Sequence, residues 1–223
     1  QSALALQCFT NEYLYDQTDA ETEVLNALEI SVERNLSDGN QPTPSQLACL
    51  ASYKVLHEYS WSNLLSMPTE LDTLYARQIL EPEEEQQLRT EMPVLQEITN
   101  NISSKVREQY EENPYPRWVN LGLSHTSKPI SKITKGLHLR LTNTRIYEVD
   151  TPQILVAGCG TGQQSISTSS RFKDCNVLAI DLSLSSLSYA KRKTEELGIT
   201  NIEYLQADIL DLGKLERQFD IVE

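Results

Sequence analysis

Three glycines at alternate positions mark the part of this chain best suited to bind a ligand. Gly158, Gly160 and Gly162 directly follow an apolar run at residues 154–157. Glycine has no Cβ atom, so it adopts positive φ angles and lets a ligand come close to the backbone. A helix starting at Gln163 would point its free N–H groups at the same place, and such groups attract anions. The pattern predicts a pocket for a nucleotide-like cofactor.

An acidic residue downstream of the glycines indicates what the cofactor contains. Asp181 ends a second apolar run and follows Gly162 by 19 residues. In nucleotide-binding folds, an acid at about this distance accepts hydrogen bonds from the hydroxyls of a ribose. The cofactor is therefore expected to carry an adenosine-like sugar.

Four short apolar runs predict the fold class. They contain ILVA at 154–157, NVLAID at 176–181, IEYLQADIL at 202–210 and FDIVE at 219–223, and helix-length segments separate the first three. Such alternation is typical of a parallel sheet with helices between its strands. We expect an α/β protein. Its first part is an all-helical domain at 1–112, followed by a connecting clamp and basic segment at 113–149. The last part, at 150–223, is the first half of a Rossmann-like, doubly wound parallel sheet.

The spacing of the glycines separates two cofactor classes. In the dinucleotide fingerprint G-x-G-x-x-G, the third glycine would fall at Gln163. This departure argues against NAD or FAD and leaves a nucleotide-dependent oxidoreductase as the weaker alternative.

With that spacing, residues 154–223 resemble the class I S-adenosylmethionine-dependent methyltransferases. VAGCGTG is similar to their first motif, AIDLS to the second, QADIL to the third and FDIVE to the start of the fourth. The resemblance implies a methyltransferase with S-adenosylmethionine as its cofactor and with FDIVE paired to the first strand. Sheets of this class usually have seven strands, so the chain is expected to be truncated, with an exposed sheet edge through which it could self-associate.

The resemblance also assigns roles to single residues. It places Asp181 on the ribose, Leu182 against the adenine, Asp208 on the adenine amino group and Ile209 beside the ring. Around the methionine part it places Gly158, Cys159, Gly160, Thr161 and Gly162. The family usually has an acid where this chain has Val156, so we expect a modest cofactor affinity.

A second segment, QYEENPYPRW at 109–118, resembles the stretch ahead of the methyltransferase domain in a group of bacterial proteins with an N-terminal helical, often tetratricopeptide-type, region. Its Tyr115, Arg117 and Trp118 could close over the cofactor or meet the substrate. Alternatively, the segment is a rigid clamp, because each proline restricts the residue before it. Tyr115 and Arg117, together with Glu223, are the candidate catalytic residues.

The net charge of −13 argues against a general nucleic-acid or anionic-membrane binder, because phosphate binding needs a cationic surface. We therefore expect a protein or small-molecule acceptor.

The four cysteines form no CxxC pair and no pattern for a metal, which favours reduced thiols and the cytoplasm. A noncatalytic module that uses the helical domain for partner binding is the other alternative.

Turn and periodicity signals predict helices throughout residues 1–112. We expect helices to begin near Asp19, at Thr43-Pro44 and at Pro82, which suits a first helical position. Ile98, Ile102 and Val106 form a last apolar stripe before Asn113-Pro114.

Overall fold

The computed structural model describes residues 1–223 apart from 67, 113, 115, 125 and 138–143. It divides the chain into two compact units, Gln1–Glu84 and Glu85–Glu223. Residues 85–112, which the sequence analysis assigned to the helical domain, thus fall in the unit that holds the sheet. The reason is local pairing within that unit: Arg192 Nε donates to Glu85 at 2.9 Å, and the Leu95 amide donates to the Gln206 carbonyl at 2.9 Å.

The first unit is helical. Thr18 and Thr43 each form a capping box, with Glu21 and Gln46 respectively, which confirms the helix starts expected near Asp19 and at Thr43-Pro44. The elements are α1 (Ser2–Thr10), α2 (Asp19–Ser37), α3 (Pro44–Leu50), η1 (Leu56–Glu58), η2 (Ser62–Leu64), η3 (Thr69–Leu71), α4 (Asp72–Tyr75) and η4 (Ala76–Leu80). Their core includes the fully buried Val32, Leu56 and Leu74.

The helix start predicted at Pro82 is wrong. Helix α5 (Glu81–Glu91) continues directly from η4, which is a π-helical turn. Proline has no N–H, and its ring collides with the carbonyl four residues earlier in a regular α-helix. A wider π turn ahead of the proline is one way for a helix to pass through such a position.

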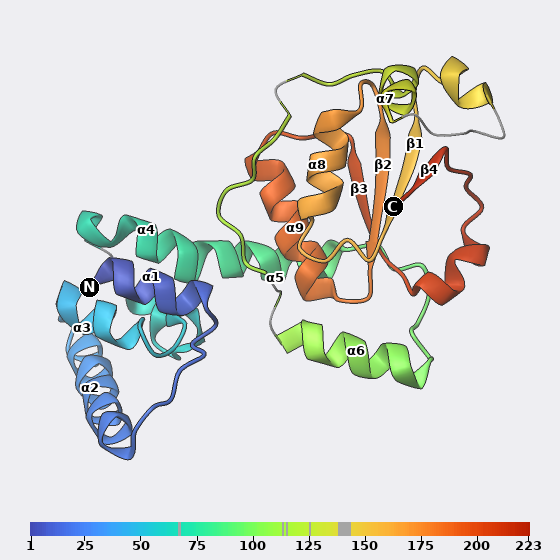
Figure 1. The fold of residues 1–223 in the computed structure, drawn as a ribbon. Helices are drawn as coiled ribbons and strands as arrows, with labels where there is room; N and C mark the ends of the chain where they lie inside the picture. Colours follow the sequence, from blue (N-terminus) through green and yellow to red (C-terminus); the bar gives the residue numbers. More distant parts are fainter. Residues whose placement is uncertain (67, 113, 115, 125, 138–143) are drawn as a thin grey trace. The chain divides into compact units, whose positions relative to one another are not determined.

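The second unit is built on four parallel strands, β1 (Gln153–Ala157), β2 (Asn176–Asp181), β3 (Ile202–Gln206) and β4 (Ile221–Val222), in the order β3-β2-β1-β4 (Figure 1). Leu155 of β1 lies opposite Leu178 of β2 and Val222 of β4. The expected placement of FDIVE beside the first strand is therefore confirmed. The remaining elements are α6 (Asn101–Glu112), α7 (Ile130–Gly136), η5 (Thr144–Glu148), α8 (Gln163–Arg171), α9 (Leu184–Glu196) and η6 (Ile209–Lys214).

Successive residues of β1 face two separate cores, as the period of a strand requires. Ile154 and Val156 pack in the cluster that includes Leu187 and Ala190 of α9, whereas Leu155 packs with β2 and β3 residues on the opposite face. Burial on both faces explains why the strand sequence is a continuous apolar run.

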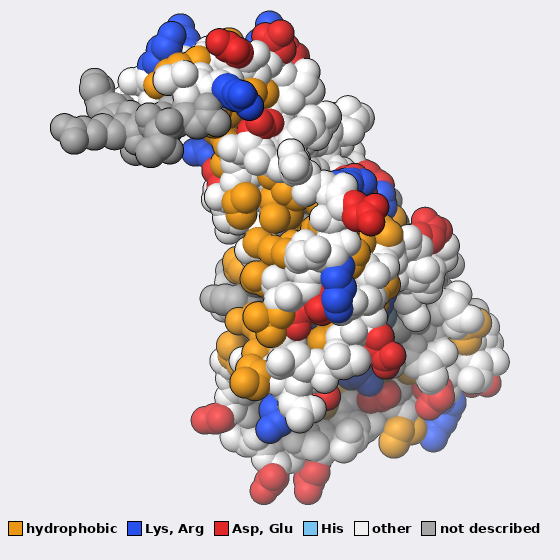
Figure 2. Space-filling model, turned by 90° about the vertical axis from the view of Figure 1, so that its right-hand side faces the viewer, with side chains coloured by type: hydrophobic (Ala, Val, Ile, Leu, Met, Phe, Trp, Pro, Cys, Tyr) orange, Lys and Arg blue, Asp and Glu red, His pale blue; other side chains and the backbone are white. Residues whose placement is uncertain are grey.

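The side of the molecule that bears β4 and η6 is rich in hydrophobic side chains, which gather in a band in Figure 2. Ile209, Leu210 and Val222 contribute there with 51%, 72% and 64% of their surfaces exposed. Within the described residues, no helix is both long enough and apolar enough to cross a membrane.

The apolar stripe expected before Asn113 is only partly a core face. Ile98 is buried, but Ile102 is 76% exposed and Val106 is 39% exposed. Ile98 precedes α6, whereas Ile102 and Val106 lie on that helix, and periodicity alone does not tell how far each of them is covered.

We predict that Gly162→Ala destabilises the sheet unit through a collision. Gly162 has φ +86°, and an added Cβ would lie 2.7 Å from the Ala190 Cβ atom of α9. Gly198→Ala is the matched control, because Gly198 also has positive φ but no atom within 4 Å of an added Cβ. The free energy of unfolding in urea should fall by about 1 to 3 kcal/mol more for Gly162→Ala than for the control, the range for overpacking. Equal losses would contradict the close approach of Gly162 to Ala190 of α9.

Candidate functional site

The turn after β1 is shaped by the three glycines. Gly158, Gly160 and Gly162 have φ angles of +80°, +51° and +86°, a region that side chains with a Cβ rarely adopt. Gly162 is the N-terminal boundary residue of α8, so the helix begins where the turn ends. The backbone of this turn therefore favours glycine at these three positions, whether or not a ligand binds there.

Asp181, at the end of β2, holds this turn from the neighbouring strand. Its Oδ2 accepts from the Gly160 amide at 2.8 Å and its Oδ1 accepts from the Ser183 amide at 2.9 Å. A carboxylate can accept about four hydrogen bonds, which is more than these two amides supply. Burial raises the pKa of Asp181 above its usual range, and the amides that bond it oppose the rise. The carboxylate can thus receive two donors side by side, as a vicinal diol supplies.

A cavity of about 320 Å³ lies at this end of the sheet. Five of the nine cofactor residues expected from the sequence line it, namely Gly158, Gly160, Asp181, Leu182 and Ile209. Its other walls were not predicted as site residues: Val106, Tyr110, Ser186 and Ala207. The volume is within the range of small-molecule pockets, at its lower end.

The missed wall comes mainly from α6. Val106 and Tyr110 are four residues apart, so they lie on the same helix face. The signal was present in the sequence, because Tyr110 continues the spacing of Ile102 and Val106. Spacing along one helix does not indicate that this face meets the end of β2.

The other four expected cofactor residues contribute differently. Gly162 meets Ala190, as described above, and Asp208 caps η6 by accepting from the Leu210 amide at 2.9 Å. Cys159 is 6% exposed. Its burial, and to a smaller extent the negative charge of Asp181, raise the pKa of its thiol well above the usual value. A thiol held in its protonated form is a poor nucleophile.

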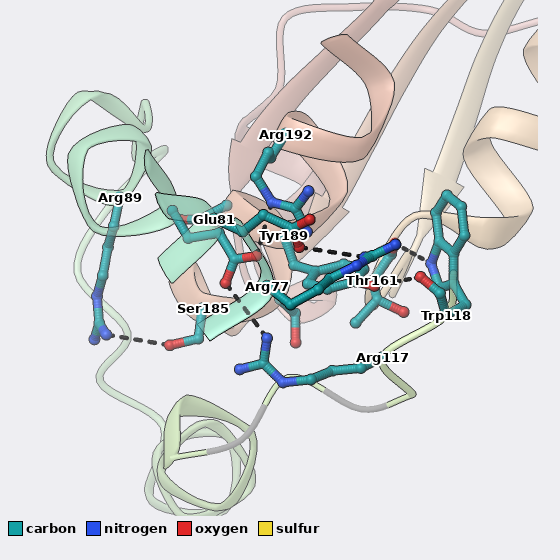
Figure 3. A network of polar contacts seen from close by, with 12 residues as sticks. Arg77, Glu81, Arg89, Arg117, Trp118, Thr161, Ser185, Tyr189 and Arg192 are labelled. Atoms are coloured by element: carbon teal, nitrogen blue, oxygen red, sulfur yellow. Dashed lines mark hydrogen bonds and ion pairs between the residues drawn. The ribbon is translucent and has the colours of Figure 1, made fainter. Parts of the chain in front are cut away.

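Thr161 connects the glycine turn to the segment at 116–118. Its hydroxyl donates to the Pro116 carbonyl at 2.9 Å, and its own carbonyl accepts from Trp118 Nε1 at 2.9 Å (Figure 3). Trp118 is 6% exposed, and its carbonyl accepts from the Tyr189 hydroxyl of α9. Trp118 thus acts as a clamp behind the turn, not as a wall of the cavity.

The candidate catalytic residue Arg117 belongs to the same clamp. Its guanidinium lies 3.6 Å from Glu85, which also accepts from Arg192 at 2.9 Å. It also lies over the ring of Tyr189, 5.7 Å from the centroid. Arg117 is thereby engaged with Glu85 and Tyr189 and is not among the residues that line the cavity. Tyr115 lies outside the described residues.

Glu223, the third catalytic candidate, is turned toward α8. Its carboxylate accepts from Gln164 at 2.9 Å and from Thr168 at 2.5 Å, and it pairs with Arg171 at 2.7 Å. Its amide and carbonyl extend the β1–β4 ladder through Leu155 and Ala157. In this arrangement the side chain fixes β4 to α8 and does not line the cavity.

Val156, where the resemblance expected an acid, is 2% exposed and packs in the core between the sheet and α9. It therefore adds no polar group to the cavity. Among the described residues, no group of three His, Cys, Asp or Glu side chains is arranged to hold a metal ion.

Comparison with known proteins agrees with this site. Residues 154–223 match the model of a family described as "Methyltransferase domain". This stretch begins in β1 and includes the glycine turn, Asp181 and β4. This part of the chain is thus similar to methyltransferase domains.

Curated relatives share parts of the chain. It is 29% identical over 124 residues to an uncharacterised protein of Rickettsia prowazekii, covering 56% of this chain and 44% of that protein. It is 31% identical over 77 residues to a tRNA (guanine-N(7)-)-methyltransferase of Rubrobacter xylanophilus, covering 34% of each. The chain thus spans less than half the length of the curated relatives it matches.

Solved structures show a similarly partial likeness. One is PKMT2 from Rickettsia typhi in complex with AdoHcy, with 27% identity and a TM-score of 0.30 over 32% of this chain and 14% of that one. Another is an S-adenosylmethionine-dependent methyltransferase from Clostridium acetobutylicum, with 23% identity and a TM-score of 0.31 over 55% and 43%.

We predict that cofactor affinity depends on pH through Asp181. Ribose hydroxyls need the ionised carboxylate as an acceptor, and burial raises the pKa of that carboxyl. The Kd for S-adenosylhomocysteine should therefore rise as pH falls through this raised pKa, at a higher pH than for an exposed aspartate, whose pKa is about 3.9.

Asp181→Asn is the control, because an amide keeps an acceptor oxygen and does not titrate. Calorimetric titration over a pH series should show the rise of the Kd for S-adenosylhomocysteine at low pH in the wild type. The variant should lack the part of this rise that comes from Asp181. Identical profiles for the two proteins would remove Asp181 from the ribose site.

Proposed function

We propose that the protein transfers the methyl group of S-adenosylmethionine to an acceptor, with the cofactor bound at the carboxyl ends of β1 and β2. The observation that carries this proposal is the geometry of Asp181. Its carboxylate is fixed by the amides of Gly160 and Ser183, lines the cavity and can accept further hydrogen bonds there. Bound S-adenosylmethionine would supply the activated methyl group, since its sulfonium carries the methyl and would leave as the neutral thioether S-adenosylhomocysteine.

The chain's own residues bind and orient in this proposal. Asp181 accepts from the ribose hydroxyls, while Leu182 and Ile209 offer apolar surface to the adenine. The open backbone at Gly158 and Gly160 receives the methionine part, because a Cβ added at Gly160 meets no protein atom within 4 Å. Alignment of donor and acceptor can carry much of the rate enhancement in such a transfer.

The proposed acceptor is a protein or a small molecule. The net charge of −13 does not favour a phosphate-rich substrate. The free cysteines Cys8, Cys49, Cys159 and Cys175 fit a reducing, cytoplasmic location. The helical first unit fits the region that precedes the methyltransferase domain in the bacterial group named above.

Calorimetric titration with S-adenosylmethionine, S-adenosylhomocysteine and NAD tests the proposal. The first two should bind and NAD should not. Asp181→Ala should weaken binding of S-adenosylhomocysteine by about 1.5 to 3 kcal/mol, the range for hydrogen bonds to a charged group. Binding of NAD alone would favour the oxidoreductase alternative, and binding of none of them would contradict the proposal.

A glycine variant separates ligand contact from backbone strain. Gly160→Val should abolish cofactor binding, because its side chain would occupy the space left open for the ligand, while the circular dichroism spectrum stays nearly unchanged. Gly198→Val is the matched control, since Gly198 has φ +67° with open space around it and follows α9, outside the cavity lining. If Gly160→Val retained the wild-type affinity, the turn would have only a structural role.

A further inference from the structure

The wall of the cavity formed by α6 is only partly covered by protein. Tyr110 is 43% exposed and Val106 is 39% exposed, although both line the cavity. Ile209, which also lines it, is 51% exposed. Large apolar side chains that remain half exposed around a cavity would be covered by a ligand that fills it.

The end of α6 is tied to the connection between β2 and α9. The Ser183 hydroxyl donates to the Tyr110 carbonyl at 3.0 Å. The Glu111 carboxylate accepts from the amides of Leu184 and Ser185 at 2.8 and 3.2 Å. It therefore serves as an N-terminal cap of α9 that comes from a distant part of the chain, and such amides at a helix start otherwise lack a partner.

Further contacts hold this junction. The Ser185 hydroxyl donates to the Glu111 carbonyl at 2.8 Å, and Arg89 pairs with the Glu111 carboxylate at 2.8 Å. Arg89 also donates to the Ser185 hydroxyl at 3.1 Å, a contact drawn in Figure 3. These contacts join the last residues of α6 to residues 183–185 at the start of α9. They leave the end of α6 little freedom to move relative to α9.

The junction decides which part of a ligand Tyr110 can meet. Its partners Ser183, Leu184 and Ser185 come directly after Asp181 and Leu182, the residues proposed to hold the ribose and adenine. The methionine part would extend instead toward the glycine turn and α8. Tyr110 therefore lies on the nucleoside side of the cavity.

We infer that Tyr110, together with Val106, forms a wall on which the purine ring of the cofactor packs, and that Glu111 is a positioning residue that holds this wall in place. The inference rests on the proposed function, since it takes the cofactor to be a nucleoside bound at Asp181. A planar base packs well on an aromatic ring, because both expose a π face and both lose contact with water.

Two ligands that share the nucleoside test this assignment. S-adenosylhomocysteine carries the amino-acid part, whereas methylthioadenosine lacks it. Tyr110→Ala should weaken the binding of both ligands by a similar factor of about ten or more, the scale of base stacking on an aromatic side chain. Tyr110→Phe should stay within about threefold of the wild type, because it keeps the ring and removes only the hydroxyl.

Ile102→Ala is the matched control. Ile102 is an apolar residue of the same helix, is 76% exposed and is not part of the cavity lining. Its affinity for both ligands should equal that of the wild type. The assignment is overturned if Tyr110→Ala binds both ligands as the wild type does, or if Tyr110→Phe loses as much affinity as Tyr110→Ala. Absence of binding to the wild type would instead contradict the proposed function.

The role of Glu111 is tested by a double-mutant cycle. Glu111→Ala removes the cap of α9 and should weaken the binding of both ligands. If Glu111 acts through Tyr110, the variant with both substitutions should bind no more weakly than Tyr110→Ala alone, because the two effects share one cause. Additive losses would contradict a positioning role, since a general destabilisation of the fold would lower affinity in either background.

Discussion

The hydrogen bond from the Gly160 amide to Asp181 is the contact on which the site depends. It joins the turn after β1 to the end of β2 at 2.8 Å. Parallel pairing of the two strands, with Ala157 opposite Ile180, brings these ends to the same edge of the sheet. Gly160 takes a positive φ in this turn, and its amide is directed at the acid. One backbone geometry thus fixes both the open surface for the ligand and the acid that would hold its sugar.

Segments upstream of the sheet support the same two strand ends. Trp118 and Pro116 hold the glycine turn through Thr161, and Glu111 holds the start of α9 after Asp181. The buried Arg192 pairs with Glu85, which also pairs with Arg117 of the clamp. The residues at 85–118 therefore belong structurally to the sheet unit.

The sequence allowed the fold of the second unit to be predicted, because its signals are local. A continuous apolar run marks a strand buried on both faces, and glycines at alternate positions mark a turn with positive φ. The glycine pattern and the acid downstream of it pointed to Gly158, Gly160 and Asp181, and the resemblance added Leu182 and Ile209; all five line the cavity. The wall at Tyr110 could not be predicted, because it depends on contacts between residues about 73 positions apart, which periodicity does not record. The domain boundary was placed too late for the same reason, and the roles assigned to Cys159, Thr161 and Asp208 stay predictions.

A crystal structure of the protein with S-adenosylhomocysteine would test the central claim most directly. The account predicts both ribose hydroxyls within hydrogen-bond distance of Asp181, with the Gly160 amide still bonded to the same carboxylate. It also predicts the purine ring between Ile209 and the α6 face that carries Tyr110. A nucleoside bound elsewhere, or a turn that rearranges to break the bond between Gly160 and Asp181, would contradict it.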